Sequence, residues 1–187
     1  PITLGFLPTH RAVFDPEPAE REKDKIARRL EELEVDYIGL DWLNDRGLID
    51  DPADAPAVAE RFQKAGVDAV LAAHCSFGDE RAVGRVCRAL EVPILLWGPR
   101  DDAPDEHGMR PRDTQCGLFA TSKLLRRLNL TFTYMINCRT ESPLFERVLD
   151  TFMRAVNVVR CVRGARVGQI STRPGPFTSV MCNESDL

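Results

Sequence analysis

Five short apolar runs alternate along this chain with segments whose apolar residues recur at helical spacing, and this alternation restricts the fold more than any other feature. The runs cover residues 2–7, 35–40, 67–73, 93–97 and 131–136. Neighbouring parallel strands must be joined by crossover helices, which cover both faces of the sheet and leave its strands apolar on both sides. The alternation therefore predicts an α/β fold, a doubly wound, flavodoxin-like domain with about five parallel strands over about residues 1–164.

Capping signals locate the helices between these runs. Asp-Pro-Glu at 15–17 offers an N-cap, a first-turn proline and a first-turn acid, and so predicts the start of a helix. Asp-Pro at 51–52 repeats the signal, and Asp79 is placed to cap the helix after the third strand. The last long helix is expected to begin at Pro143 and to end at Gly164.

A further strand-helix pattern begins after residue 164 and is not completed. Residues 167–170 predict a strand, residues 172–177 a loop, and residues 178–187 the first turns of a helix. A lone strand with two helical turns cannot bury a hydrophobic core. Residues 165–187 therefore either join the first sheet or open a second α/β domain. We expect the second arrangement, with the rest of that domain absent from this chain.

The composition excludes several classes of partner. The 187 residues suffice for one full domain, and the formal net charge is only −4 without a run of Lys and Arg, so no surface for nucleic acid or an anionic membrane is expected. No apolar segment approaches the roughly 20 residues of a membrane helix, and no signal peptide is recognisable, which predicts a soluble, cytoplasmic protein. The six cysteines form no Cys-x-x-Cys pair, which favours reduced thiols.

Polar and aromatic residues follow each predicted strand, at the edge where open α/β sheets bind their ligands. These strand ends lie at residues 8–11, 41–44, 74–79, 97–102 and 137–140. They combine arginines, carboxylates, amides and hydroxyls with two tryptophans. This mixture suits a polyol, because hydroxyls need hydrogen-bond partners and C–H faces stack on aromatic rings. Any α/β domain also places polar residues there, so strand ends without ligand chemistry are an equal alternative.

Residues 74–81, His-Cys-Ser-Phe-Gly-Asp-Glu-Arg, allow a second chemistry. Cys75 and Arg81 stand at the spacing of a cysteine-dependent phosphatase loop, where a helix N-terminus stabilises the thiolate and the arginine binds phosphate oxygens. Asp79 and Glu80 argue against a phosphatase, because they would place two carboxylates in a cradle for an anion. The three histidines of the chain lack the spacing of a metal-binding motif, so no metal site is predicted.

Four segments carry a family resemblance. They read LGFLPTHR near the start, VDAVLAAHCSFGDE in the middle, VPILLWGPRDD after it and GARVGQISTRPGPFTSVMCNESDL at the end. Together they are similar to the L-fucose isomerase family, which is related to the L-arabinose isomerases, and above all to its shorter fucose isomerase-like members. The last segment resembles the opening of that family's second domain, often R-x-G-x-x-x-x-R-P, here Arg166, Gly168, Arg173 and Pro174.

The resemblance implies the amino-terminal part of an aldose-ketose isomerase. Such an enzyme moves a proton between C1 and C2 of a sugar through an enediol, with Mn²⁺ or a similar divalent metal holding the sugar oxygens. In that family the metal ligands and the proton-transfer groups come from later domains, so no catalytic residue and no metal ligand is expected in this chain, which alone would be inactive. The first domain lends substrate contacts across a subunit boundary, which implies a homo-oligomer, a trimer or a hexamer.

Single positions can also be carried over from the family. Arg11 matches an arginine that contacts the sugar, and Phe77 with Gly78 matches an aromatic-glycine pair. Cys75 stands where L-fucose isomerases carry a tryptophan that stacks on the substrate. This difference puts L-fucose in doubt and leaves the apolar wall to Trp97 or Trp42. The candidate substrate-binding residues are His10, Arg11, Trp42, Cys75, Ser76, Phe77, Trp97 and Arg100.

Two further classes of function stay open beside the isomerase. One is a non-catalytic sugar-binding module that uses the same strand ends. The other is a thiol phosphatase with Cys75 as nucleophile and Arg81 as phosphate ligand. Acidic and histidine ligands in residues after Leu187 would favour the isomerase, and their absence would favour the binding module.

Overall fold

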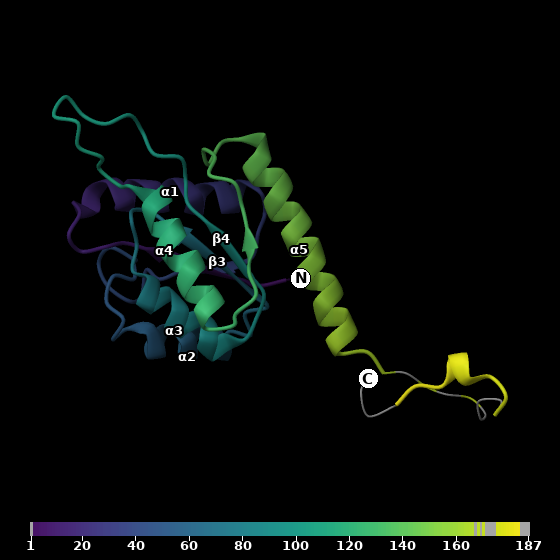
Figure 1. The fold of residues 1–187 in the computed structure, drawn as a ribbon. Helices are drawn as coiled ribbons and strands as arrows, with labels where there is room; N and C mark the ends of the chain where they lie inside the picture. The colour runs from purple at the N-terminus through teal and green to yellow at the C-terminus, as the bar shows by residue number, and fades with distance from the viewer. Residues whose placement is uncertain (1, 167, 169, 171–174, 184–187) are drawn as a thin grey trace.

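A five-stranded, all-parallel sheet with helices on both faces forms the body of the protein (Figure 1). The computed structural model describes residues 2–166, 168, 170 and 175–183. The strand order is β2-β1-β3-β4-β5, which is the flavodoxin-like order and confirms the predicted fold class. The strands are β1 (Leu4–Thr9), β2 (Tyr37–Ile38), β3 (Ala69–His74), β4 (Ile94–Trp97) and β5 (Thr133–Tyr134).

Five α-helices form two layers around the sheet. They are α1 (Pro16–Glu32), α2 (Ala55–Lys64), α3 (Glu80–Leu90), α4 (Thr114–Arg127) and α5 (Pro143–Arg163). One core cluster joins α1 and α5 to alternate residues of β1 and β3, such as Phe6 and Leu71. The other joins α2, α3 and α4 to the residues between them, such as Leu7 and Val70. Because successive side chains of a strand point to opposite faces, these clusters are the two sides of one sheet.

The central strands agree with their prediction better than the edge strands do. All six residues of β1 and all six of β3 are buried, as continuous apolar runs require. The edge strands β2 and β5 have only two residues each, although six were expected for each. Both are paired on one side only, so fewer hydrogen bonds extend them than extend a central strand.

Two of the three predicted caps are confirmed and one is wrong. Asp15 accepts a hydrogen bond from the backbone N–H of Glu17 at the start of α1. Asp79 accepts two, from the N–H groups of residues 81 and 82, at the start of α3. Asp51 instead accepts from the N–H of Ala53, which closes a separate turn, and α2 begins later, at Ala55.

The described residues 175–183, which follow α5 in the chain, lie apart from the sheet (Figure 1). The predicted strand at 167–170 falls partly outside the described residues, and Gly168 and Ile170 are not in a strand. Of the helix predicted from residue 178, the structure shows one 3₁₀ turn, η1 (Thr178–Val180), and residues 184–187 lie outside the described part. Among all the residues that the structure describes, no helix is long and apolar enough to cross a membrane.

Candidate functional site

The candidate site lies at the carboxyl ends of β1 and β3, where the strand order changes direction. From this point the chain runs from β1 to α1 on one face and from β3 to α3 on the other. In open α/β sheets, ligands usually bind where the connections diverge in this way. The loop residues at this point are 9–11 after β1 and 74–80 at the end of β3.

Backbone geometry fixes the loop after β3. Gly78 has a φ of +77°, and a Cβ there would lie 2.5 Å from His74 Nδ1, so the position needs glycine. The N–H of Asp79 donates to Thr9 Oγ1 over 2.9 Å. The hydroxyl of Thr9 in turn donates to the carbonyl oxygen of Ile49 over 3.1 Å. These bonds tie the β3 loop to β1 and to the chain that follows β2.

Arg11 is held on three sides at the surface of this loop. Its Nε donates to the carbonyl oxygen of Gly78 over 2.7 Å, and its Nη2 pairs with the carboxylate of Glu80. The guanidinium carbon lies 4.7 Å from the centroid of the Phe77 ring, which also stacks on Phe14. The Arg11 side chain nevertheless stays 31% exposed. The arrangement therefore presents a fixed guanidinium group to the solvent beside an aromatic ring.

His10 and Ser76 support Arg11 from beneath. Ser76 Oγ accepts the backbone N–H of Arg11 over 3.1 Å and lies 2.9 Å from His10 Nδ1. Both residues are fully buried, and burial lowers the pKa of His10. They thus position Arg11 rather than offer a surface of their own.

Cys75 and Trp97 do not lie where the sequence placed them. Both side chains are 0% exposed. The Trp97 ring packs 4.6 Å from the Phe145 ring of α5, centroid to centroid, and Cys75 belongs to the same core cluster. Neither residue contributes to the surface of this domain, so Trp97 does not form the apolar wall for which it was a candidate beside Trp42.

The geometry also opposes a phosphatase loop. Burial raises the pKa of the Cys75 thiol above its ordinary value, so a thiolate is disfavoured. The Arg81 side chain is 69% exposed, and its Nη2 lies 3.6 Å from Asp79 Oδ2. A buried neutral thiol and an outward-directed arginine do not form a phosphate cradle.

Trp42 and Arg100 lie on the surface, after β2 and β4 respectively. Trp42 is 44% exposed and Arg100 is also exposed. Within the described residues, neither is hydrogen-bonded or ion-paired to Arg11. Of the eight predicted residues, the structure therefore brings together His10, Arg11, Ser76 and Phe77.

Sequence reasoning missed a buried ionic network at the ends of β4 and β5. Arg112 is 3% exposed, and its Nη1 lies 3.5 Å from Glu22 Oε2 on α1. Its Nη2 donates to the carbonyl oxygen of Arg100 over 2.9 Å and lies 3.8 Å from Asp101 Oδ1. Thr140 donates its hydroxyl to Glu22 over 3.0 Å. The network ties two loops of the carboxyl edge, the one between β4 and α4 and the one between β5 and α5, to α1.

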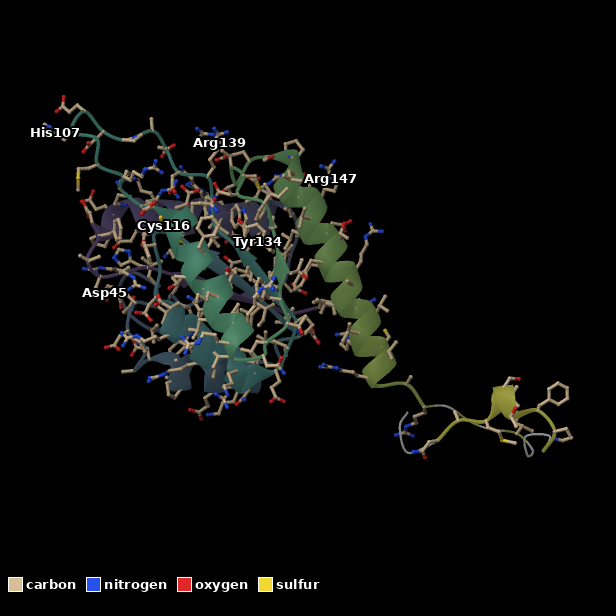
Figure 2. All side chains as sticks on the ribbon, in the orientation of Figure 1. Asp45, His107, Cys116, Tyr134, Arg139 and Arg147 are labelled. Atoms are coloured by element: carbon tan, nitrogen blue, oxygen red, sulfur yellow. The ribbon has the colours of Figure 1, made fainter. Side chains whose placement is uncertain are left out.

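Glu22 carried a signal that could have revealed this network. It lies on the same stripe of α1 as the buried residues Ala19, Ile26 and Leu30. A carboxylate on a buried stripe needs a cationic partner. Arg112, in the loop from 98 to 113, is that partner. The same loop projects from the carboxyl edge, with His107 near its tip and Cys116 and Arg139 near its base (Figure 2).

His74 makes the stability of the fold dependent on pH. Its Nδ1–H donates to the carbonyl oxygen of Phe77 over 2.8 Å, and burial lowers its pKa to about 4 from the ordinary 6.5. Between these values the unfolded chain binds a proton that the folded chain excludes, so stability falls as the pH falls. We expect a loss of about 1.5 kcal/mol between about pH 6.5 and about pH 5 in chemical denaturation.

The control variants isolate this effect. His74→Gln, whose amide can still donate to Phe77, should show a clearly shallower decline of unfolding free energy with pH, and the exposed His107→Gln should match the wild type. A decline of equal slope in His74→Gln would show that other groups cause it.

The fold and the site together define a class of protein. They describe an α/β domain that presents a fixed arginine beside an aromatic ring at the carboxyl ends of β1 and β3. Residues 5–163 match the model of the fucose/sulfoquinovose isomerase N-terminal domain, and the chain belongs to that family. The match confirms the predicted family relationship.

Among curated protein sequences, none matches this chain. Similar solved structures include the transcription regulator CcpA of Lactococcus lactis, with 13% identity and a TM-score of 0.34 over 89% of this chain and 74% of that one. A galactofuranose binding protein has 13% identity and a TM-score of 0.33 over 84% of this chain and 63% of that one. Likenesses this distant carry no argument about function.

Proposed function

We propose that this chain is the sugar-contacting amino-terminal domain of a metal-dependent aldose-ketose isomerase that acts in carbohydrate metabolism. The observation that supports this most is the immobilised guanidinium of Arg11 at the switch point of a domain from an isomerase family. A family domain alone leaves the substrate open. The site chemistry restricts it to ligands that accept hydrogen bonds and have apolar faces.

Arg11 suits a neutral sugar better than an anion. Its charge is balanced by Glu80, and its Nε is used by the Gly78 carbonyl. The remaining N–H groups can donate to hydroxyl or carbonyl oxygens of a sugar, and the Phe77 ring beside it can pack against C–H groups. Because the side chain is already fixed, little conformational entropy is lost on binding.

The divalent metal that the family resemblance implies has no site of suitable ligands among the described residues. Among the described residues, no group of three or more His, Cys, Asp or Glu could hold a metal ion. As the family resemblance implies, the proposal assigns the ligands of Mn²⁺ or a similar ion, and the proton-transfer groups, to later domains of the full-length protein. In this proposal residues 165–187 open the second domain, the enzyme is a cytoplasmic homo-oligomer, a trimer or hexamer, and its subunits complete each site.

Arg11→Lys in the full-length protein tests the role of this domain. Lysine keeps the charge but cannot both bind the Gly78 carbonyl and lie flat on Phe77. We expect kcat/KM for the aldose substrate to fall roughly 10- to 100-fold, as for the loss of one or two charged hydrogen bonds. Arg88→Lys, an exposed change on α3, is the matched control and should have no effect. Equal activity of both variants would remove Arg11 from the substrate site.

A further inference from the structure

Glu80 lies beside Arg11 at the carboxyl ends of β1 and β3. It is the first residue of α3, and its Oε2 pairs with Nη2 of Arg11. The two side chains are almost equally exposed, 31% for Arg11 and 30% for Glu80. The surface that presents the guanidinium group to the solvent therefore presents a carboxylate beside it.

This ion pair leaves one hydrogen-bonding atom free on each residue. The Nε of Arg11 is used by the Gly78 carbonyl, and its Nη2 is used by Glu80. Within the described residues, Arg11 Nη1 and Glu80 Oε1 have no hydrogen-bond partner, and both atoms reach the solvent. Nη1 can only donate a hydrogen bond, and a carboxylate oxygen can only accept one. A ligand at this place therefore meets a donor and an acceptor together.

Hydroxyl groups match such a pair better than charged groups do. A hydroxyl both donates and accepts, so one hydroxyl of a sugar can accept from Arg11 Nη1 while its neighbour donates to Glu80 Oε1. A dianionic phosphate or a carboxylate can use only the donor, and its negative charge would meet that of Glu80. The half-buried Phe77 ring, 4.7 Å from the guanidinium carbon, supplies an apolar surface for the C–H groups between the hydroxyls.

The backbone fixes the place of the Glu80 carboxylate without using it. Asp79 caps α3 by accepting two backbone N–H groups of the first turn, so the helix start does not need the Glu80 side chain as an acceptor. The N–H of Asp79 donates to Thr9 Oγ1 over 2.9 Å, which ties the start of α3 to the strand that leads to Arg11. The carboxylate and the guanidinium group are thus held at their spacing before a ligand binds, which lowers the entropic cost of binding.

We propose that Glu80 is a substrate-binding residue that, together with Arg11, binds adjacent hydroxyl groups and so determines the specificity of the site for uncharged sugars. This inference rests on the proposed function, in which Arg11 contacts the sugar. It adds a second contact residue and the requirement that the ligand donate a hydrogen bond as well as accept one. Sugar phosphates, sugar acids and an aldose without the hydroxyl that faces Glu80 are therefore poor ligands.

Glu80→Gln in the full-length protein tests this contact by titration calorimetry. The amide oxygen of glutamine can still accept from Arg11, but its NH₂ group replaces the acceptor Oε1. A panel of aldoses gives the tightest ligand, and the monodeoxy analogues of that aldose are then titrated into both proteins. At least one analogue should bind the wild type roughly 10- to 100-fold more weakly than the parent aldose. Glu80→Gln should weaken the parent by a similar factor and no longer distinguish it from that analogue.

A charged ligand tests the second half of the inference. The wild type should prefer the free aldose to its 6-phosphate, and Glu80→Gln should reduce this preference at least about threefold, because one negative charge is removed near the ligand. Glu91→Gln, an exposed change of the same kind at the other end of α3, is the matched control and should bind every ligand like the wild type. Circular dichroism should show that both variants are folded.

The contrary outcomes differ from a failure of the proposed function. If Glu80 only positioned Arg11, Glu80→Gln would keep every ratio between the parent aldose and its deoxy analogues, and this result would overturn the contact. An unchanged preference for the free aldose over its phosphate would overturn it as well, and so would the absence of binding to any aldose. Sugar that binds with the expected discrimination but is not converted to a ketose would instead refute the isomerase and leave the role of Glu80 intact.

Discussion

Gly117→Ala should destabilise this protein strongly although it replaces glycine by the best helix former. A Cβ at position 117 of α4 would lie 1.6 Å from the carbonyl oxygen of Phe77 and 2.9 Å from His74 Nδ1. The obstacle is backbone, which cannot move aside cheaply. Helix propensity favours alanine by only about 1 kcal/mol, so sterics decide, and we expect the free energy of unfolding to fall by about 3 kcal/mol or more.

Urea denaturation measures this loss, and Gly84→Ala is the matched control. A Cβ at Gly84 of α3 would meet the side-chain ends of two leucines, Leu124 Cδ2 at 3.0 Å and Leu128 Cδ1 at 3.1 Å, and flexible leucines can turn away. The control should therefore stay within about 1 kcal/mol of the wild type. Because Phe77 also carries Arg11, Gly117→Ala should raise KM for the sugar in whatever fraction folds. A Gly117→Ala protein as stable as the Gly84→Ala protein would contradict the close helix-loop contact.

Arg112→Met should be the most damaging single change of a charged residue. It removes the cation from Glu22 and Asp101 while both carboxylates remain largely buried. Breaking a buried pair on one side costs about 3–5 kcal/mol, because an uncompensated charge stays behind. Urea denaturation should show a loss of this order. Arg110→Met, on the exposed part of the same loop, should change stability by less than about 0.5 kcal/mol.

A double variant separates loss of the charge pair from loss of packing. Arg112→Met combined with Glu22→Leu removes the Glu22 charge as well and should recover part of the stability, because an apolar pair can replace a buried ion pair at little cost. If the double variant were less stable than Arg112→Met alone, the ion pair with Arg112 would not be the reason why Glu22 stabilises the fold.

The central part of the fold followed from the sequence because burial on both faces leaves an unambiguous pattern. β1 and β3 are continuous apolar runs and were placed within two residues. The edge strands were predicted too long, since residues such as Ile136 are apolar without being paired in the sheet; Ile136 is 66% exposed. Apolar character alone does not show where hydrogen bonding to a neighbour stops.

The site was predicted in part for a related reason. Arg11 and Phe77 follow buried strands and emerge at the surface, as expected of strand ends. Cys75 continues the alternation of Leu71 and Ala73 into the core beneath α1 and α5, so its neighbours in the strand already indicated burial. Trp97 ends β4 on that same side, where α5 covers it. A residue's position after a strand predicts that it lies at the carboxyl edge of the sheet. The alternation of side chains along the strand decides whether that residue points into the core or toward the solvent.

The most direct test of the central claim is aldose-ketose interconversion by the full-length protein with Mn²⁺. A panel of aldoses is incubated with the wild type and with Arg11→Lys, and the ketose formed is measured by chromatography. We expect that at least one aldose is converted and that the rate falls in the variant. Conversion of none of the aldoses, with sugar binding intact, would contradict the isomerase and leave a sugar-binding module. Conversion that is unchanged in Arg11→Lys would contradict the assignment of the substrate contact to this domain.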